Sequence, residues 1–178
     1  MIVVHVAITT AEQYVVKREP HRRAHIERLA GLRAGGVVIG GGPALDSRSV
    51  DLVYRLGQAD QLAPLVEEDP YWTAGAWTRY VPRSFAEFIE PWELPAIVLD
   101  GSRPATIVEG RTAEHDMAQF ALIELRGAGR LAFGGFFPDG DTFALCRTAD
   151  AAQAAEWFAS AGFWAPESLH TRGLLHVL

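Results

Sequence analysis

The sequence predicts an α+β protein built from two consecutive βαββαβ units. Strand-like apolar runs and segments of helical spacing follow one another in this order twice along the chain. Two pairs of segments also echo each other, "LRAGGVVIGGGP" with "LRGAGRLAFGGFFP" and "DLVYRLGQAD" with "DTFALCRTAD". Because βαββαβ is the ferredoxin-like order, we expect two fused copies of one ferredoxin-like fold.

The composition is that of a globular protein and argues against several classes of function. Of the 178 residues, 49% are hydrophobic and 21% are charged, and the formal net charge is -6. The acidic balance argues against a general binder of nucleic acid, and no apolar run approaches the roughly 20 residues of a membrane span. Residues 1–10 lack a basic leader and Cys146 is the only cysteine, so we expect a cytoplasmic protein without disulfides.

The first unit is expected to span residues 1–88 and to contain four strands and two helices. Apolar or alternating runs predict strands at 2–8, 37–40, 50–56 and 76–81. Helical spacing predicts helices at 20–34 and 59–68. The "GGP" at 41–43 is expected to interrupt the second strand, in a bulge where a ligand or another backbone comes close.

The limits of both helices follow from residues with fixed backbone preferences. Gly35 and Gly36 suit the end of the first helix. The apolar stripe of that helix is expected to be Ile26, Leu29, Ala30 and Leu32. The second helix should end before Asp69, because Asp69 precedes Pro70 and such a residue disfavours helical backbone.

The second unit is expected to span residues 95–178, after a linker at 83–95 that contains two prolines. Its elements are predicted as a strand at 96–99, a helix at 113–129, a hairpin at 130–146, a helix at 149–162 and a strand at 171–178. Helices should cover one face of each sheet, so the other face needs a second apolar layer. We expect the two sheets to pack face to face as an internal pseudo-dimer, with a further homodimer left open.

The start of the first helix, "REPHRRAHIERL", concentrates basic and titratable groups. His25 lies at the edge of the expected apolar stripe, and Arg22 lies one turn earlier on the same side. Arg22 and Arg23 occupy the first turn, where the helix dipole disfavours cations. Such a break of a local rule points to function, since a cationic helix start would attract a carboxylate, phenolate or enolate. A half-buried structural histidine beside solvated arginines is the alternative.

Metal and nucleotide sites are weaker alternatives. His21 and His25 have the i, i+4 spacing of a metal-binding helix, but the sequence has no glutamate in the HExxH position and no clear third ligand. The "IGGGP" at 39–43 is not followed by a helix, which argues against a nucleotide loop. We therefore expect neither a metal nor a cofactor.

The stretch "EEDPYW" at 67–72 is the second candidate for chemistry. Asp69 stands at a helix exit and is held by Pro70, so it is placed for general-base work or for orienting a histidine. A polar helix end followed by a turn is the alternative. Tyr71, Trp72 and Trp77 could line an apolar pocket or simply pack in the core, and the core is favoured for Trp77.

The stretches "RRAHIERLAGLRAGGVVIGGGPAL" and "EEDPYWTAGAW", with a hydrophobic strand between them, resemble the YCII family. The family pattern is Arg-x-x-His-x-x-x-Leu, a glycine stop, a strand ending in Gly-Pro, and a later Asp-Pro-Tyr/Phe followed by a glycine. Residues 1–85 match it along their whole length. The resemblance implies a dimeric α+β barrel of ferredoxin-like units, related to muconolactone isomerase, with an active site built on a His–Asp dyad.

Carried onto this sequence, the resemblance implies a catalytic dyad of His25 and Asp69. The substrate-binding residues it implies are Arg22, Gly42, Pro43, Tyr71 and Trp72. The second half departs from the pattern, because Ala118 falls opposite His25 when the glycine stops are aligned, and "SAGFW" replaces "EDPYW". One competent site per chain is therefore implied.

Together these features predict a cofactor-independent lyase or isomerase. His25 would shuttle a proton, Asp69 would orient it, and Arg22 would hold an anionic group of a small aromatic, lactone or polyketide-like substrate. A place in specialised biosynthesis is a further expectation. Two alternatives stay open: a non-catalytic small-molecule-binding or accessory subunit, and a cofactorless oxygenase.

Overall fold

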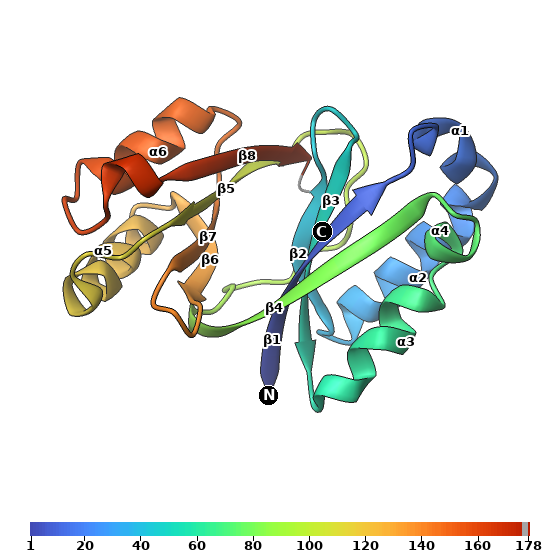
Figure 1. The fold of residues 1–178 in the computed structure, drawn as a ribbon, viewed down its shortest axis with the longest axis horizontal. Helices are drawn as coiled ribbons and strands as arrows, with labels where there is room; N and C mark the ends of the chain where they lie inside the picture. The colour runs from blue at the N-terminus through green and yellow to red at the C-terminus, as the bar shows by residue number, and fades with distance from the viewer. Residues whose placement is uncertain (176–177) are drawn as a thin grey trace. The chain divides into compact units, whose positions relative to one another are not determined.

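The computed structural model describes residues 1–175 and 178 (Figure 1). Contacts divide the chain into two compact units. Among the described residues, the first unit comprises 1–84, 94–100 and 178, and the second comprises 85–93 and 101–175. No helix in the described part of the chain is long and apolar enough to cross a membrane.

The first unit contains strands in the order β2-β3-β1-β4. They are β1 (Ile2–Thr10), β2 (Val38–Pro43), β3 (Ser49–Leu56) and the first part of β4 (Trp77–Ile89). β3 pairs antiparallel with both β1 and β2. This is the ferredoxin-like order predicted for the first half, with the first and third strands at the centre of the sheet.

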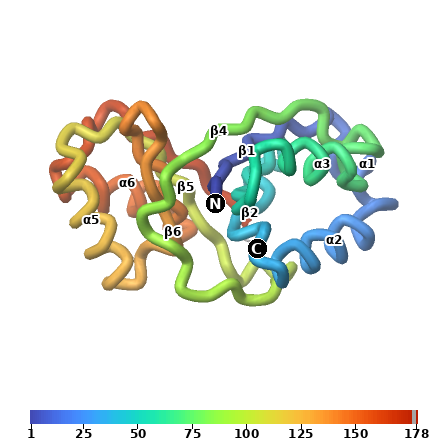
Figure 2. The backbone as a smooth tube through the Cα atoms, turned by 90° about the horizontal axis from the view of Figure 1, so that it is seen from below, coloured from blue at the N-terminus to red at the C-terminus, as the bar shows by residue number. Residues whose placement is uncertain are grey.

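The helices of this unit are α1 (Tyr14–Arg18), α2 (Arg22–Ala34), α3 (Leu62–Glu67) and α4 (Pro70–Thr73). Figure 2 shows α2 and α3 on the same side of β1 and β2. The core between sheet and helices includes Val4, Val6, Ile8, Leu52, Leu29 and Val66. Because side chains alternate along a strand, His5 and Asp51 lie on the opposite face of the sheet, where both are buried.

The second unit repeats this topology. Its elements are β5 (Pro104–Gly110), α5 (His115–Gly127), β6 (Leu131–Phe136), β7 (Thr142–Cys146), α6 (Ala151–Ala159) and β8 (His170–Leu175). The strands follow the order β6-β7-β5-β8, and residues 86–89 of β4 pair with β6. The βαββαβ order is therefore confirmed in both halves of the chain.

Two equivalent arginines build the same helix-to-strand junction in each unit. Arg33, near the end of α2, donates a hydrogen bond to the carbonyl of Val38 at the start of β2. Arg126, near the end of α5, donates to the carbonyl of Ala132 in β6. Both arginines are buried and stand at matching positions of the echoing segments. The sequence echo therefore corresponds to a structural one.

One predicted strand and one predicted strand limit are wrong. Residues 96–99 form no strand, because their apolar character reflects packing of Ile97 against the core of the first unit. The first strand of the second unit is β5 at Pro104–Gly110, which was not predicted. β4 continues to Ile89, and much of the expected linker at 83–95 is strand because residues 86–89 find backbone partners in β6. The last strand, predicted at 171–178, is β8 as far as Leu175, and residues 176–177 lie outside the described residues.

Gly41, Gly42 and Pro43 continue β2 and do not interrupt it, which corrects the prediction. The expected bulge is present between Val38 and Gly40. Gly41 has a φ of 125°, and a Cβ at this position would overlap the backbone carbonyl of Asp51 on β3. The close approach of two backbones predicted here is confirmed.

The first predicted helix begins later than expected and buries a different face. α2 starts at Arg22, after α1 and a 3-10 turn at Glu19–His21. Its buried residues are His25, Leu29 and Arg33, one above another at i, i+4 and i+8. Ala30, assigned to the apolar stripe, is exposed. The buried face of α2 therefore contains His25 and Arg33 in place of part of the predicted apolar stripe.

Candidate active site

Asp69 occupies the junction between α3 and α4. α3 ends at Glu67, as the following proline predicts, and Asp69 itself has an extended backbone with a ψ of 137°. Its Oδ1 accepts the backbone N–H of Tyr71 at 2.8 Å and so caps α4, a short helix that the sequence analysis missed. The Asp-Pro-Tyr stretch therefore fixes a buried carboxylate in one position.

His25 meets this carboxylate from the buried face of α2. Its Nδ1 lies 2.8 Å from Oδ1 of Asp69, and the two residues are only 6% and 2% exposed. Since a carboxylate accepts hydrogen bonds, the contact assigns the proton of the neutral imidazole to Nδ1. Nε2 then keeps its lone pair, and no described residue hydrogen-bonds to it. This arrangement suits an imidazole that accepts a proton at Nε2.

Aromatic rings enclose the imidazole of His25. Tyr71 stacks on it, with ring centroids 3.8 Å apart and planes 15° apart. Trp77 meets it edge-on at 5.2 Å, and Tyr14 in turn meets Tyr71 edge-on at 6.0 Å. Burial raises the pKa of Tyr71 to about 12, so this phenol stays neutral at physiological pH. Tyr14 was not predicted from the sequence, and Trp77, which was expected in the core, also lies there.

The positive charges of two arginines act on the hydroxyl of Tyr71. Arg18 places its guanidinium 4.9 Å from the ring centroid of Tyr14. Arg22 is exposed at the first position of α2. The charges of Arg18 and Arg22 act on Tyr71 to lower its pKa, against the larger effect of burial. The positive charge of the helix start inferred from the sequence therefore acts on Tyr71.

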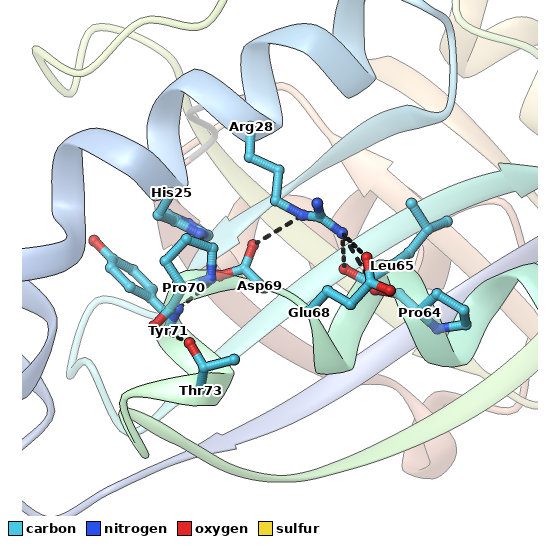
Figure 3. A network of polar contacts seen from close by, with 9 residues as sticks. All are labelled: His25, Arg28, Pro64, Leu65, Glu68, Asp69, Pro70, Tyr71 and Thr73. Carbon is cyan, nitrogen blue, oxygen red and sulfur yellow. Dashed lines mark hydrogen bonds and ion pairs between the residues drawn. The ribbon is translucent and has the colours of Figure 1, made fainter.

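Arg28 contacts Asp69 on the side away from His25 (Figure 3). Its Nε lies 4.0 Å from Oδ2 of Asp69, and its Nη2 donates to the carbonyls of Pro64 and Leu65. Arg28 was not among the site residues predicted from the sequence. Its i, i+3 spacing from His25 could have identified it, because residues so spaced lie on neighbouring parts of a helix surface.

The structure does not gather all the residues predicted to bind substrate. Trp72 packs edge-on against Tyr80, with ring centroids 5.3 Å apart, and no described ring contact joins it to His25. Gly42 and Pro43 lie in β2 opposite Asp51 and Val50 of β3. Of the predicted set, Tyr71 contacts His25 directly, and the charge of Arg22 acts on the hydroxyl of Tyr71.

A second buried His–Asp pair, which the sequence analysis missed, lies on the other face of the same sheet. Nε2 of His5 is 2.7 Å from Oδ1 of Asp51, and both side chains are almost fully buried. His5 stands in the first strand-like run, "IVVHVAI", where a histidine interrupts an otherwise apolar stretch. That interruption was the available sign of a buried polar contact.

Two cavities adjoin the residues around the dyad. One, of about 710 Å³, is lined by residues 9–16 and 46–48 and includes Tyr14 in its wall. The other, of about 520 Å³, includes Arg28 together with Arg55, Gln61 and Glu68. Neither lining contains His25 or Asp69. The first cavity adjoins the dyad's surroundings through Tyr14, which contacts Tyr71, and the second through Arg28, which contacts Asp69.

His21, the second histidine of the metal alternative, is exposed in the 3-10 turn before α2. Over residues 1–175 and 178, no group of three His, Cys, Asp or Glu side chains converges as a metal site would require. Among the described residues, His25 is therefore paired with Asp69 and does not belong to a group of three such side chains.

Solved structures of low sequence identity share the fold. A monooxygenase-like protein from Fusobacterium nucleatum superposes with a TM-score of 0.60 at 10% identity, over 99% of this chain and 92% of that chain. A chlorite dismutase-like protein superposes with a TM-score of 0.56 at 10% identity, over 98% and 95%. These neighbours are of the dimeric α+β barrel type, and the likeness concerns the fold alone.

One solved structure and one family model each match about half of the chain. A 5-chloro-2-hydroxyhydroquinone dehydrochlorinase from Burkholderia phenoliruptrix has 21% identity and a TM-score of 0.41, over 51% of this chain and 93% of that chain. No curated protein matches the chain. Residues 1–86 match the model of the YCII-related domain, in agreement with the resemblance seen in the sequence.

Proposed function

We propose that the protein is a cofactor-independent lyase or isomerase acting on a small anionic or carbonyl-bearing substrate. The observation that supports this most directly is the buried contact of 2.8 Å between His25 and Asp69 inside an aromatic cluster. A buried imidazole with one nitrogen fixed by a carboxylate, and the other without a hydrogen bond to a described residue, is suited to general acid–base catalysis near neutral pH.

In the proposed reaction, Nε2 of His25 removes a proton from a carbon beside a carbonyl or lactone group. The electron pair of the broken C–H bond moves onto the carbonyl oxygen as an enolate. In a lyase, collapse of the enolate expels a leaving group from the adjacent carbon. In an isomerase, the enolate takes the proton back at a different carbon, which shifts the double bond. Asp69 stabilises the imidazolium formed in the first step, and general acid–base help of this kind contributes about 10²–10⁴-fold to rate.

The enolate and any carboxylate of the substrate need a positive environment. Arg22, with Arg18 beside it, is proposed to supply this charge near the hydroxyl of Tyr71. The cavity of about 710 Å³ that includes Tyr14 is the proposed approach for the substrate. We propose substrates with a planar aromatic, lactone or polyketide-like ring, because rings stack well on the aromatic side chains here.

The two halves are proposed to be a tandem duplication, at 1–88 and 95–178, whose sheets pack as an intramolecular dimeric α+β barrel. In the second half Ala118, fully buried in α5, takes the aligned position of His25. A methyl group cannot transfer a proton, so only the first half would carry the chemistry. A cytoplasmic location and a role in specialised biosynthesis belong to the same proposal.

A panel of hydroxyquinones, lactones and β-keto acids in D₂O tests the function. Wild-type protein should exchange the acidic C–H proton or turn over at least one compound, and His25→Ala should lower that rate by about 100-fold or more. His115→Ala, at the position aligned with Arg22 in the second half, is the control and should keep the wild-type rate. A wild-type rate in His25→Ala would refute the assignment. Binding without exchange would favour the non-catalytic alternative, and a requirement for O₂ would favour the oxygenase.

A further inference from the structure

We propose that Arg28 is a positioning residue of the His25–Asp69 pair, which acts through the carboxylate to keep the imidazole neutral. The inference builds on the proposed role of the pair. It adds a residue that neither the sequence motif nor the dyad itself includes, and it assigns that residue an electrostatic task.

The two carboxylate oxygens of Asp69 have different partners (Figure 3). Oδ1 faces Nδ1 of His25 and accepts the N–H of Tyr71, both at 2.8 Å. Oδ2 faces Nε of Arg28 at 4.0 Å. The carboxylate therefore lies between one imidazole and one guanidinium, and the charge of each affects the other through it.

Arg28 is held in place by contacts that are independent of Asp69. Its Nη2 donates to the carbonyls of Pro64 at 3.2 Å and Leu65 at 3.4 Å, both in α3. Glu68 approaches Nη2 only to 3.8 Å and is largely exposed, so solvent screens its charge. Nε of Arg28 is buried without a hydrogen bond. Arg28 is therefore fixed by α3 and keeps its positive charge beside the Asp69 carboxylate without a hydrogen bond at Nε.

The sign of the effect follows from counting charges. With His25 neutral, the Asp69 carboxylate and the Arg28 guanidinium cancel, whereas an imidazolium would leave one net positive charge in a buried place. Asp69 alone would favour the imidazolium, and Arg28 offsets that attraction.

Other titratable or charged groups face the dyad from the neighbouring elements. They are Tyr14 and Arg18 of α1, Arg22 of α2, Tyr54 of β3 and Tyr71 of α4. Burial raises the pKa of Tyr54 and Tyr71, so both phenols stay neutral through the range in which an imidazole titrates. Because all these groups are the same in each variant proposed below, they cannot account for a difference between variants.

The test is an NMR titration of the His25 ring in the intact protein. Arg28→Gln removes the charge, and Arg28→Met is a second uncharged variant that keeps the apolar stem. Either should move the titration midpoint of His25 upward by roughly half to one pH unit. Arg28→Lys keeps the charge and should restore the wild-type midpoint. Arg23→Gln is the matched control, because Arg23 lies on the same helix but is exposed and paired with Glu27 at 2.8 Å.

A purely structural role for Arg28 predicts a different pattern. Loss of the contacts to α3 would lower the unfolding temperature of the Gln, Met and Lys variants and leave the His25 midpoint unchanged, and that result would overturn the inference. A shift of equal size in Arg23→Gln would also overturn it, since general surface charge would then suffice. The titration needs no substrate, so its outcome is separate from the loss of turnover that tests the proposed function.

Discussion

Asp69 and Tyr71 are joined by a hydrogen bond of 2.8 Å, from the backbone N–H of Tyr71 to the same carboxylate oxygen that faces His25. The aspartate is thus the cap of α4 and the partner of the imidazole at once. Since Tyr71 also stacks on His25, the Asp-Pro-Tyr stretch holds the histidine ring both at its edge and at its face. Stability and chemistry are therefore coupled at this position.

Removal of the Asp69 carboxylate should be costly to the fold. Asp69→Ala deletes a helix cap and leaves a buried imidazole nitrogen without its partner, so we expect a loss of roughly 2–4 kcal/mol in the free energy of unfolding. Asp150→Ala is the matched control, because the exposed Asp150 carboxylate caps α6 by accepting two backbone N–H groups and no hydrogen bond joins it to a buried histidine among the described residues. It should lose about 1 kcal/mol in a urea titration. Equal losses in both variants would contradict a stabilising role for the His25 contact.

Arg22→Ala should weaken the binding of an anionic substrate or product analogue by roughly 5- to 30-fold, because one nearby positive charge is removed. The ring stack and the His25–Asp69 contact do not involve Arg22, so the fold should be unaffected. Arg23→Ala, one residue further and turned to solvent, serves as the comparison. Isothermal titration of both variants checks the prediction, and identical affinities for the two would remove the proposed clamp.

Gly41→Ala should destabilise the protein by roughly 3 kcal/mol or more. A methyl group at Gly41 would overlap the Asp51 carbonyl, and the φ of 125° is strained for any other residue. Gly31→Ala offers the opposite case, because its Cβ would meet nothing within 4 Å on a helix. It should gain about 0.5–1 kcal/mol. Urea midpoints of both variants measure the difference, and a neutral Gly41→Ala would show that β2 can move away from β3.

Alkaline pH should weaken the fold through Tyr71. The pKa of Tyr71 is about 12 in the folded protein against 10.0 for an ordinary phenol, so the unfolded chain loses this proton first. Stability is therefore full below about pH 10 and falls as the pH rises toward 12. Tyr71→Phe should lose less of its free energy of unfolding than wild type between pH 10 and 12, by at most roughly 2 kcal/mol. Parallel urea titrations at each pH would reveal whether the two proteins instead weaken equally.

Much of the fold could be predicted because its determinants are local. Helix and strand periods, the glycines after α2 and the proline after Asp69 each act within a few residues, and they give the main helices and strands of both halves in order, except for the first strand of the second half. The errors arise where a segment acquires its structure from a distant partner. Residues 86–89 become strand by pairing with β6, and residues 96–99 are apolar because Ile97 packs on a core far from it in sequence.

The candidate site shows the same division. The sequence by itself determined that a histidine on α2 and an aspartate before Pro70 were available, since both stand in recognisable local patterns. Only the tertiary structure decided that their side chains, 44 residues apart, meet at 2.8 Å, that Arg28 faces the second carboxylate oxygen, and that Trp72 turns to Tyr80. The physical reason is that backbone preferences act between neighbours along the chain, whereas side-chain contacts between elements depend on how helices and sheet pack together.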